Sequence, residues 1–355
     1  MIDSHNSCSR RQMLAGSLAV TLGWPYQSKL LADEALEGGA PKGDAPRSAA
    51  DHKGKALIAI TLDLEMSRNF PTWETTHWDY EKGNLNDETK NYTVEACRRV
   101  KASGGVLHSF VVGQVLEHAS VEWIKGIAAA GHPLGNHTYD HVDLFTDDID
   151  KVQWRFKRAP WLIEGKSVAQ VVRDNIRLCD VALRQRVGVK SNGFRMPGGS
   201  GAGLKSRPEL QELLLGLGFK WVSTQNASHT LGQRNGADLT PDEYADVVRA
   251  NASCQPYIYP SGLIEVPNSP VMDIAAFRYG QWKLDTFLKA TRLGVEWAIE
   301  NRAMYDFIGH PSCMYVVDPE FKTIDLICEL VEAAGDKAAI VGLDAFAARA
   351  KANAT

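Results

Sequence analysis

The sequence predicts an α/β protein built on a largely parallel sheet. Short apolar runs of strand length alternate with longer segments of helical spacing over most of the 355 residues. Polar side chains also follow several of the apolar runs directly, and the carboxyl ends of parallel strands are where such folds carry their chemistry. Because parallel strands need crossover connections, the alternation indicates a sheet that is either open or closed into a barrel.

The predicted elements follow one another in chain order. Continuous apolar runs predict two strands, at residues 56–62 and 106–112, and a third strand is predicted just before residue 137. Further short strands are predicted at residues 191–194, 220–223, 263–266, 305–308 and 339–341. Helical spacing predicts helices at residues 93–102, 120–130, 168–186, 208–217, 284–299 and 324–334.

The amino terminus is predicted to be an export signal, residues 1–35. Two adjacent arginines precede an apolar run at residues 13–24, which is too short to span a bilayer comfortably. This pattern resembles a bacterial twin-arginine signal, which implies recognition by the Tat export machinery, a periplasmic or secreted protein, and no stable membrane span after processing. Residues 36–53 are rich in Ala, Gly, Pro and charge and are predicted to be a flexible linker. The folded domain is predicted to be residues 54–355.

Composition restricts the partners. The chain is 44% hydrophobic and 23% charged, within the ordinary range for globular proteins, and its formal net charge is −4. It therefore lacks the broad basic field that nucleic acid binding needs, and we expect a small or neutral substrate. None of the six cysteines belongs to a C-x-x-C pair. This spacing argues against a cysteine zinc site or a dense disulfide framework and leaves a single disulfide open.

Residues 137–141 (HTYDH) are the first candidate for a metal site. We expect the two histidines to project from the same side of a helical turn and to offer one ion two imidazoles. The same spacing is common on helices without any role, so the interpretation depends on other residues. Asp63 and Glu65 follow the first predicted strand, where alternate residues share a face. One of these carboxylates would complete a two-histidine, one-carboxylate site with His137 and His141, and the other could act as a base.

Two later strands are also followed by polar residues. Arg195 precedes a Pro-Gly-Gly turn; an arginine can hold a carboxylate with two hydrogen bonds, and the glycines let the backbone approach a ligand. His310 follows the predicted strand at residues 305–308, although a lone histidine in such a place is more often structural. Aromatic residues between positions 66 and 91 would either stack on sugar rings or pack as a lid.

In this order the motifs resemble those of the NodB-homology polysaccharide deacetylases, carbohydrate esterase family 4. Residues 61–65 (TLDLE) are similar to the first motif of the family, T-F-D-D, and residues 137–141 match the second, H-[ST]-x-x-H. Residues 195–199 (RMPGG) match R-x-P-x-G, and residues 308–310 (IGH) approximate L-x-H. The resemblance covers roughly residues 55–347 and implies a distorted (β/α) barrel of about seven parallel strands.

The resemblance also implies a reaction and a role for each residue. The reaction would be the hydrolysis of an N-acetyl or O-acetyl group on a carbohydrate by a metal-activated water. His137 and His141 would bind the ion, and Asp63 would be the general base. Arg195 would hold Asp63 in place, and His310 would be the general acid toward the departing amine. The ion is expected to be divalent, with zinc first and cobalt, nickel or manganese as alternatives.

Two departures from the family pattern bear on these roles. Leu64 replaces the second aspartate of the family, its usual metal ligand, so we assign Glu65 to the metal and keep Asp63 as the alternative. Residues 219–226 contain no aspartate where the family carries the one that orients the late histidine. Two other functions therefore stay open: a metal-dependent hydrolase of a small or cyclic non-sugar amide, and a catalytically silent barrel that binds glycan.

Overall fold

The computed structural model describes residues 52–66, 82–227 and 234–354. The predicted export signal, most of the predicted linker and the aromatic residues at positions 67–81 lie outside the described residues. Within the described ranges, no helix combines the length and the apolar character that crossing a membrane requires. The five cysteines that these ranges contain are all buried and free.

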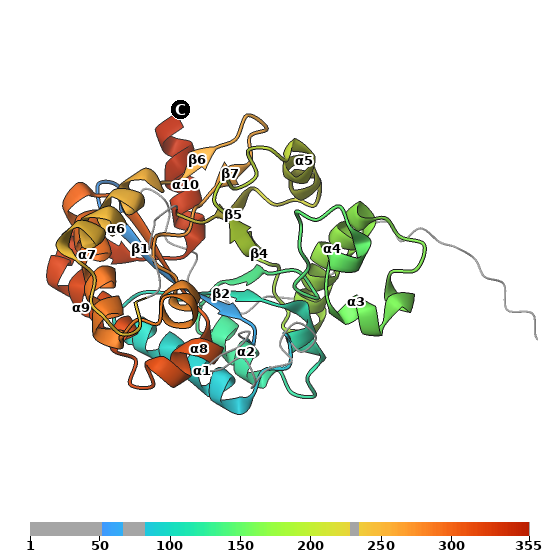
Figure 1. The fold of residues 1–355 in the computed structure, drawn as a ribbon, viewed down its shortest axis with the longest axis horizontal. Helices are drawn as coiled ribbons and strands as arrows, with labels where there is room; N and C mark the ends of the chain where they lie inside the picture. Colours follow the sequence, from blue (N-terminus) through green and yellow to red (C-terminus); the bar gives the residue numbers. More distant parts are fainter. Residues whose placement is uncertain (1–51, 67–81, 228–233, 355) are drawn as a thin grey trace, which may run out of the picture. The chain divides into compact units, whose positions relative to one another are not determined.

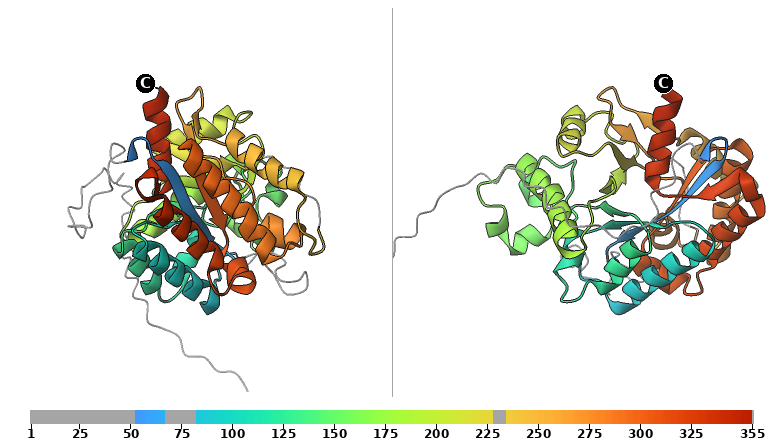
Figure 2. Two further views of the ribbon diagram at one scale, coloured as in Figure 1. Left: turned by 90° about the vertical axis from the view of Figure 1, so that its left-hand side faces the viewer. Right: turned by 180° about the vertical axis from the view of Figure 1, so that it is seen from behind.

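Nine strands form one mostly parallel sheet (Figure 1). The strands are β1 (Ala56–Leu64), β2 (His108–Val111), β3 (Leu134–Asn136), β4 (Phe194–Ser200), β5 (Trp221–Gln225), β6 (Tyr257–Ile258), β7 (Ile264–Glu265), β8 (Met304–Gly309) and β9 (Ala338–Ile340). Their order is β6-β7-β5-β4-β3-β2-β1-β8, β9 pairs with the start of β1, and only the β6–β7 pairing is antiparallel. The sheet curls into a half-barrel, which confirms the predicted fold class (Figures 1 and 2). Among the described residues the sheet has nine strands, where about seven were predicted.

Helices surround the sheet. They are α1 (Asp87–Ala102), α2 (Glu122–Ala129), α3 (Arg155–Arg158), α4 (Val168–Arg186), α5 (Pro208–Gly216), α6 (Pro241–Ser253), α7 (Leu284–Asn301), α8 (Pro311–Val317), α9 (Lys322–Ala334) and α10 (Leu343–Ala354). A π-helix, η6, covers Ile274–Tyr279, and short 3-10 turns are η3 (Gly113–Glu117), η4 (Ile149–Lys151), η5 (Pro160–Leu162) and η7 (Gly335–Lys337). Helices α1, α2, α7 and α9 contribute to one core with the outward residues of β1.

Strand β1 shows how the sequence places the inside of the half-barrel. All nine of its residues are buried. The even-numbered residues from Ala56 to Leu64 pack with the outer helices, whereas Leu57 and Ala59 pack in a second core with residues of α10. Because successive side chains of a strand point to opposite faces, Thr61 and Asp63 continue the inward row. The apolar run therefore predicts a strand that is buried on both faces, and its polar end marks the site.

Two predicted elements show where local signals succeed and where they fail. Helix α4 has the predicted limits, and Ser167 begins it with a capping box. The strand predicted at residues 191–194 is displaced, because β4 begins at Phe194 and includes Arg195 and the Pro-Gly-Gly segment. Its pairing with β5 shifts register after Arg195, and Gly198 and Gly199 have φ values of 76° and 61°. The two glycines therefore form a bulge within a strand and not the predicted turn.

Candidate metal centre and active site

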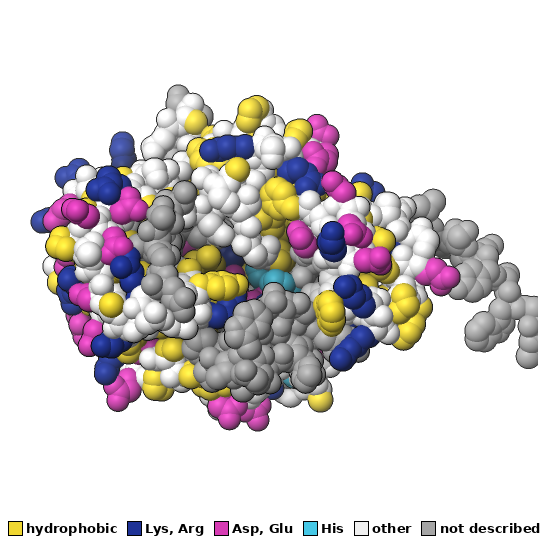
Figure 3. Space-filling model, in the orientation of Figure 1, with side chains coloured by type: hydrophobic (Ala, Val, Ile, Leu, Met, Phe, Trp, Pro, Cys, Tyr) yellow, Lys and Arg dark blue, Asp and Glu magenta, His cyan; other side chains and the backbone are white. Residues whose placement is uncertain are grey.

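All the predicted site residues lie at the end of the half-barrel formed by the carboxyl ends of its strands. They are Asp63 and Glu65 of the first motif, His137 and His141 after β3, Arg195 on β4, and His310 after β8. Histidine side chains are visible at the bottom of a hollow in the face drawn in Figure 3. The structure thus brings together residues that are up to 247 positions apart, the separation of Asp63 and His310 (310 − 63).

The two histidines of the second motif converge through a loop and not through the predicted helical turn. Residues 137–141 contain no helix, and Thr138 and His141 have φ values of 59° and 58°. Such left-handed conformations are uncommon outside glycine and are frequent at functional sites. The Thr138 hydroxyl accepts a hydrogen bond from the backbone N–H of Val142 (3.0 Å), and the Thr138 N–H donates to Asn136 Oδ1 (2.9 Å). Thr138 therefore orders the loop.

Helix α4 fixes this loop from the side. The backbone N–H of Asp140 donates to Asn175 Oδ1 (2.7 Å), and Asn175 Nδ2 donates to Asp140 Oδ2 (3.2 Å). The backbone N–H of Tyr139 donates to the carbonyl of Asn175 (3.1 Å). Asp140 also forms a partly buried ion pair with Arg155. The residues between the two histidines are thus held by contacts distant in sequence, which no local pattern reveals.

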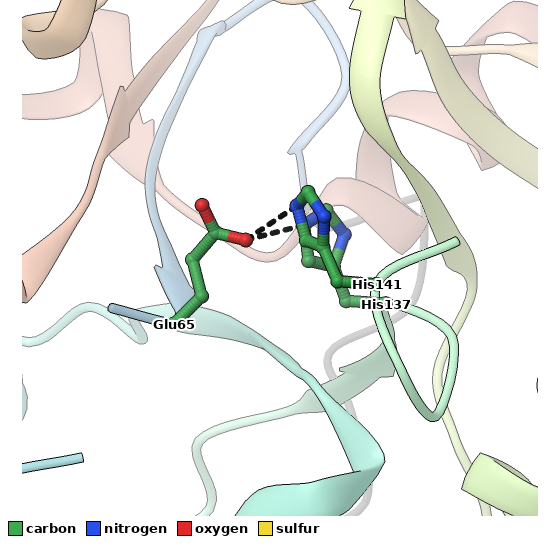
Figure 4. Close-up of side chains that lie close together, drawn as sticks. All are labelled: Glu65, His137 and His141. Atoms are coloured by element: carbon green, nitrogen blue, oxygen red, sulfur yellow. Dashed lines mark ion pairs between the residues drawn. The ribbon is translucent and has the colours of Figure 1, made fainter. Parts of the chain in front are cut away.

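Glu65, His137 and His141 form a group that could hold a metal ion (Figure 4). Their ligand atoms all lie within 4.8 Å of one another. Glu65 Oε2 is 2.5 Å from His141 Nε2 and 3.7 Å from His137 Nε2. His137 Nδ1 lies 2.9 Å from the backbone oxygen of Arg195, so Nδ1 carries the proton and Nε2 presents a lone pair. Burial lowers the pKa of His141 to about 4, which keeps the ring neutral, as metal binding requires.

The chemistry of this group fits a divalent ion. Glu65 Oε2 is buried and accepts no hydrogen bond, a costly state for a carboxylate oxygen. Two imidazoles and one carboxylate are a common ligand set for zinc and its neighbours, and they leave positions open for water and substrate. Asp63 is less suited as a ligand, because Arg195 donates to its Oδ1 (3.0 Å) and its Oδ2 is 3.8 Å from His137 Nε2.

Arg195 crosses the interior of the half-barrel and is 1% exposed. Its guanidinium donates hydrogen bonds to side chains of β1, β5 and β8. The acceptors are Asp63 Oδ1 (3.0 Å), Thr61 Oγ1 (2.8 Å), Ser223 Oγ (3.2 Å) and Asp306 Oδ2 (2.6 Å). One face of the guanidinium also lies over the Phe110 ring, 4.2 Å from its centroid. Arg195 was predicted only to hold Asp63, but its hydrogen bonds join its own strand, β4, to β1, β5 and β8.

Arg195 pairs with two buried carboxylates, Asp63 and Asp306, but the pKa values of the two shift in opposite directions. Burial raises the pKa of Asp63, but Arg195, His137 and His310 outweigh burial, so this pKa lies below its usual value. Asp306, which the sequence analysis missed, has its pKa raised by burial to about 7 despite Arg195. Asp63 is therefore the carboxylate that stays ionised and can accept a proton. An acidic residue inside the apolar run of β8 was the available sequence signal for Asp306.

Asp273 orients His310, a role for which the sequence analysis found no residue. Asp273 is fully buried just before η6; its Oδ1 lies 2.8 Å from His310 Nδ1, and its Oδ2 accepts from the His310 backbone N–H (2.6 Å). Burial lowers the pKa of His310, but Asp273, together with the charges of Glu65 and Asp63, more than offsets burial, so this pKa is raised. His310 Nε2 then faces the site, 4.0 Å from Asp63 Oδ2. A lone acid among apolar residues 271–274 was the sequence signal.

A cavity of about 520 Å³ opens beside His141. It lies between the loop that follows β3 and the Pro-Gly-Gly segment of β4. Phe145, Lys151 and Trp154 contribute to its lining, and Trp154 is 50% exposed. The volume is that of a small-molecule site, and tryptophan offers an apolar face together with a polar N–H. The cavity can therefore accept a ligand of one or a few rings next to the metal group.

Comparisons with known proteins agree with this arrangement. The profile of the family named polysaccharide deacetylase matches residues 80–213, which include His137, His141 and Arg195. No curated protein sequence matches the chain significantly. Among solved structures, a putative polysaccharide deacetylase from Mycobacterium smegmatis is 18% identical, with a TM-score of 0.55 over 85% of this chain and 92% of that chain.

Two further solved structures have the same fold. A probable polysaccharide deacetylase from Pseudomonas aeruginosa PAO1 is 13% identical, with a TM-score of 0.54 over 82% of this chain and 89% of that one. The Puue allantoinase is 14% identical, with a TM-score of 0.52 over 89% of this chain and 97% of that one. At these identities the similarity is one of fold, and the site itself must support the chemistry.

Proposed function

We propose that this chain is a member of the polysaccharide deacetylase family, whose model matches residues 80–213, and that it is a metal-dependent hydrolase that removes an N-acetyl or O-acetyl group from a carbohydrate. One observation carries the proposal. The ligand atoms of Glu65, His137 and His141 lie within 4.8 Å of one another, next to a carboxylate paired with Arg195 and a histidine paired with an aspartate. The family is one of hydrolases, and this arrangement offers a metal site, a base and an acid together.

Two residues beside the metal group, Asp63 and His310, would each carry out one proton transfer of the reaction. A divalent ion bound there would supply Lewis acidity to a water molecule and to the substrate carbonyl. Asp63, kept ionised by Arg195, would accept the proton of the attacking water. His310, kept protonated by Asp273, would donate a proton to the departing amine or alcohol. Nε2 of His310 and Oδ2 of Asp63 are 4.0 Å apart, so one acyl group could have the attacking water beside Asp63 and the departing nitrogen or oxygen beside His310.

A second candidate function is hydrolysis of a small or cyclic amide. The cavity beside His141 measures about 520 Å³, a volume that suits a small molecule as well as a single sugar ring. The fold similarity to an allantoinase supports keeping this candidate. The chemistry of the metal group would be the same for both substrates, because each reaction attacks an acyl carbon with water.

The catalytically silent alternative loses its main support. It rested on a missing metal carboxylate and a missing partner for the late histidine. Glu65 lies beside His137 and His141 and is a candidate for the metal carboxylate. Asp273 contacts His310 and is a candidate for its missing partner. These two residues support the hydrolase proposal over the catalytically silent alternative.

The decisive experiment combines metal content with product release. Purified mature protein is analysed for elements and incubated with N-acetylated chito-oligosaccharides, with acetate as the readout. We expect one equivalent of a divalent ion and release of acetate. Metal without acetate, but with opening of a cyclic amide, would favour the second candidate. An absence of metal after reconstitution would overturn both.

We also propose export by the twin-arginine route, on the basis of Arg10, Arg11 and the apolar run that follows them. In a bacterium with a functional Tat system, the full chain is expected in the periplasm or the medium. The double change of Arg10→Lys and Arg11→Lys is expected to retain it in the cytoplasm. Equal secretion of both forms, measured by fractionation, would contradict this route.

A further inference from the structure

Each carboxylate at the end of β1 has its own buried cation. Asp63 Oδ1 is 3.0 Å from Arg195 Nη1, and Oε1 of Glu65 forms an ion pair with Lys82 Nζ. The side chains of Lys82 and Glu65 are 6% and 5% exposed. Lysine is almost never this buried unless it is paired, because removing its charge from water is costly. The buried ion pair with Glu65 therefore makes Lys82 part of the site, although no motif of the sequence pointed to it.

The backbone around Glu65 is fixed as well. The N–H of Met66 donates to the carbonyl of Lys82 (2.9 Å), so the two ends of the ion pair belong to segments joined by a backbone hydrogen bond. Ser312 Oγ donates to the Glu65 carbonyl (2.8 Å). The Glu65 side chain thus starts from a fixed backbone, and Lys82 binds one of its two carboxylate oxygens.

The two oxygens of Glu65 consequently face different groups. Oε1 is next to Lys82 and lies 3.7 Å from His310 Nε2. Oε2 has no hydrogen bond and faces His141 Nε2 at 2.5 Å and His137 Nε2 at 3.7 Å. Holding Oε1 leaves Oε2 as the oxygen that points between the histidines. Outer residues that hydrogen-bond a metal ligand orient it in this way.

We propose that Lys82 is a positioning residue that holds Oε1 of Glu65 and thereby presents Oε2 to the metal ion. Lys82 would make Glu65, and not Asp63, the carboxylate ligand, in compensation for Leu64 at the position of the family's usual ligand. The inference rests on the proposed function only in assuming that Glu65, His137 and His141 bind a divalent ion. It requires no particular substrate.

The test measures Co²⁺ affinity, by competition with a chromophoric chelator, in the mature protein. Lys82→Met is expected to weaken Co²⁺ binding by about ten- to a hundred-fold, the usual effect of losing such an outer contact, and to change the visible spectrum of the bound ion. Lys82→Arg keeps the charge and is expected to restore most of the affinity. Lys125→Met removes a lysine that pairs with Glu122 on the exposed surface of α2, and its Co²⁺ affinity should equal that of the unchanged protein.

A double-mutant cycle separates positioning from a general loss of stability. If Lys82 acts through Glu65, adding Lys82→Met to Glu65→Gln should weaken Co²⁺ binding no further. Unchanged or tighter binding by Lys82→Met would overturn the inference and leave the proposed hydrolase intact, because Lys82 would then only repel the ion. No Co²⁺ binding by the unchanged protein would instead overturn the metal-dependent function, and the inference with it. Thermal unfolding of each variant confirms that folded proteins are compared.

Discussion

Asp63 and Glu65 lie two positions apart in the chain, and their surroundings prepare them for different tasks. Arg195 occupies one oxygen of Asp63 and keeps it ionised, whereas Oε2 of Glu65 faces the imidazoles of His137 and His141. Pairs of titratable groups with contrasting partners are typical of sites that separate a base from a ligand. The sequence left these two roles open because alternation places both side chains in one pocket and says nothing about their partners.

Replacing Asp63 tests this division directly. Asp63→Asn keeps the shape and an acceptor for Arg195 but removes the basic oxygen. We expect turnover to fall by about 10²- to 10⁴-fold, the usual contribution of a general base, with metal content unchanged. Elemental analysis and acetate release on the same preparation give both readouts. Loss of the ion from this variant would mean that Asp63 is a ligand and Glu65 the better candidate for the base.

Asp273 is expected to act on the reaction through His310 alone. Asp273→Asn should lower kcat by about 10²-fold, at the lower end of what an acid–base group contributes, because the imidazole loses the charge that keeps it protonated. KM and Co²⁺ affinity should change little, since no metal ligand contacts Asp273 among the hydrogen bonds described. A large loss of Co²⁺ affinity with unchanged kcat would show that Asp273 supports the metal group instead.

Asp273, Asp306 and Lys82 were not predicted, and the reason is the same for each. Their roles come from contacts with residues distant in sequence, so no spacing rule identifies them. Asp273 and Asp306 carried a weaker signal, a charge among apolar residues, which indicates a buried partner but not which partner; Lys82, between Glu81 and Gly83, carried no such signal. By contrast, the ends of strands identified Asp63 and His310, because chain order alone places such residues at one end of a parallel sheet.

At the scale of elements, the loop between the two histidines is the main departure from the predictions. The spacing of residues 137–141 suits one turn of helix, but Thr138 and His141 adopt left-handed conformations instead. Hydrogen bonds that the backbone N–H groups of Tyr139 and Asp140 donate to Asn175 on α4 hold these conformations. Tertiary contacts thus overrule the local pattern, as is expected where a site stores backbone strain.

Helix α4 should therefore influence the metal group. Asn175→Ala removes two side-chain hydrogen bonds to Asp140, and we expect a loss of about 1–3 kcal/mol in the free energy of unfolding together with weaker Co²⁺ binding. Ser167→Ala, at the amino-terminal end of the same helix, removes the N-cap and should cost about 1 kcal/mol without affecting the ion. Equal Co²⁺ affinities in the two variants, measured at matched stability, would argue against coupling between α4 and the histidines.

Strands were predictable where burial alone decides them. Strand β1 is apolar over its whole length because both of its faces are covered, and it was placed correctly from residue 56. Strand β4 was displaced because Pro-Gly-Gly is a turn signal in most sequences. Here the same residues make a bulge, which lets the strand continue past Arg195 to Ser200. The hydrogen bonds of Arg195 to β1, β5 and β8 hold the start of β4 in the sheet.

At the scale of the whole molecule, the metal group joins parts of the half-barrel that lie far apart in sequence. Glu65 follows β1, and His137 and His141 belong to the loop between β3 and η4, so a bound ion would connect these segments only in the folded state. A ligand that binds only the folded state stabilises it by about 2.7 kcal/mol at a concentration one hundred times Kd. Metal binding should therefore be visible in thermal unfolding.

We expect the mature protein to unfold at a higher temperature with saturating Co²⁺ than after chelation. For a domain of about 300 residues, whose unfolding entropy is about 0.6 kcal/mol/K, the rise should be about 1–2 °C for each kcal/mol of binding free energy. His141→Ala removes one ligand and should abolish the rise, and Asp63→Asn should retain it. Scanning calorimetry of the three proteins, each with and without the ion, provides the measurement. An equal rise in His141→Ala would place the stabilising ion elsewhere and separate it from the group formed by Glu65, His137 and His141.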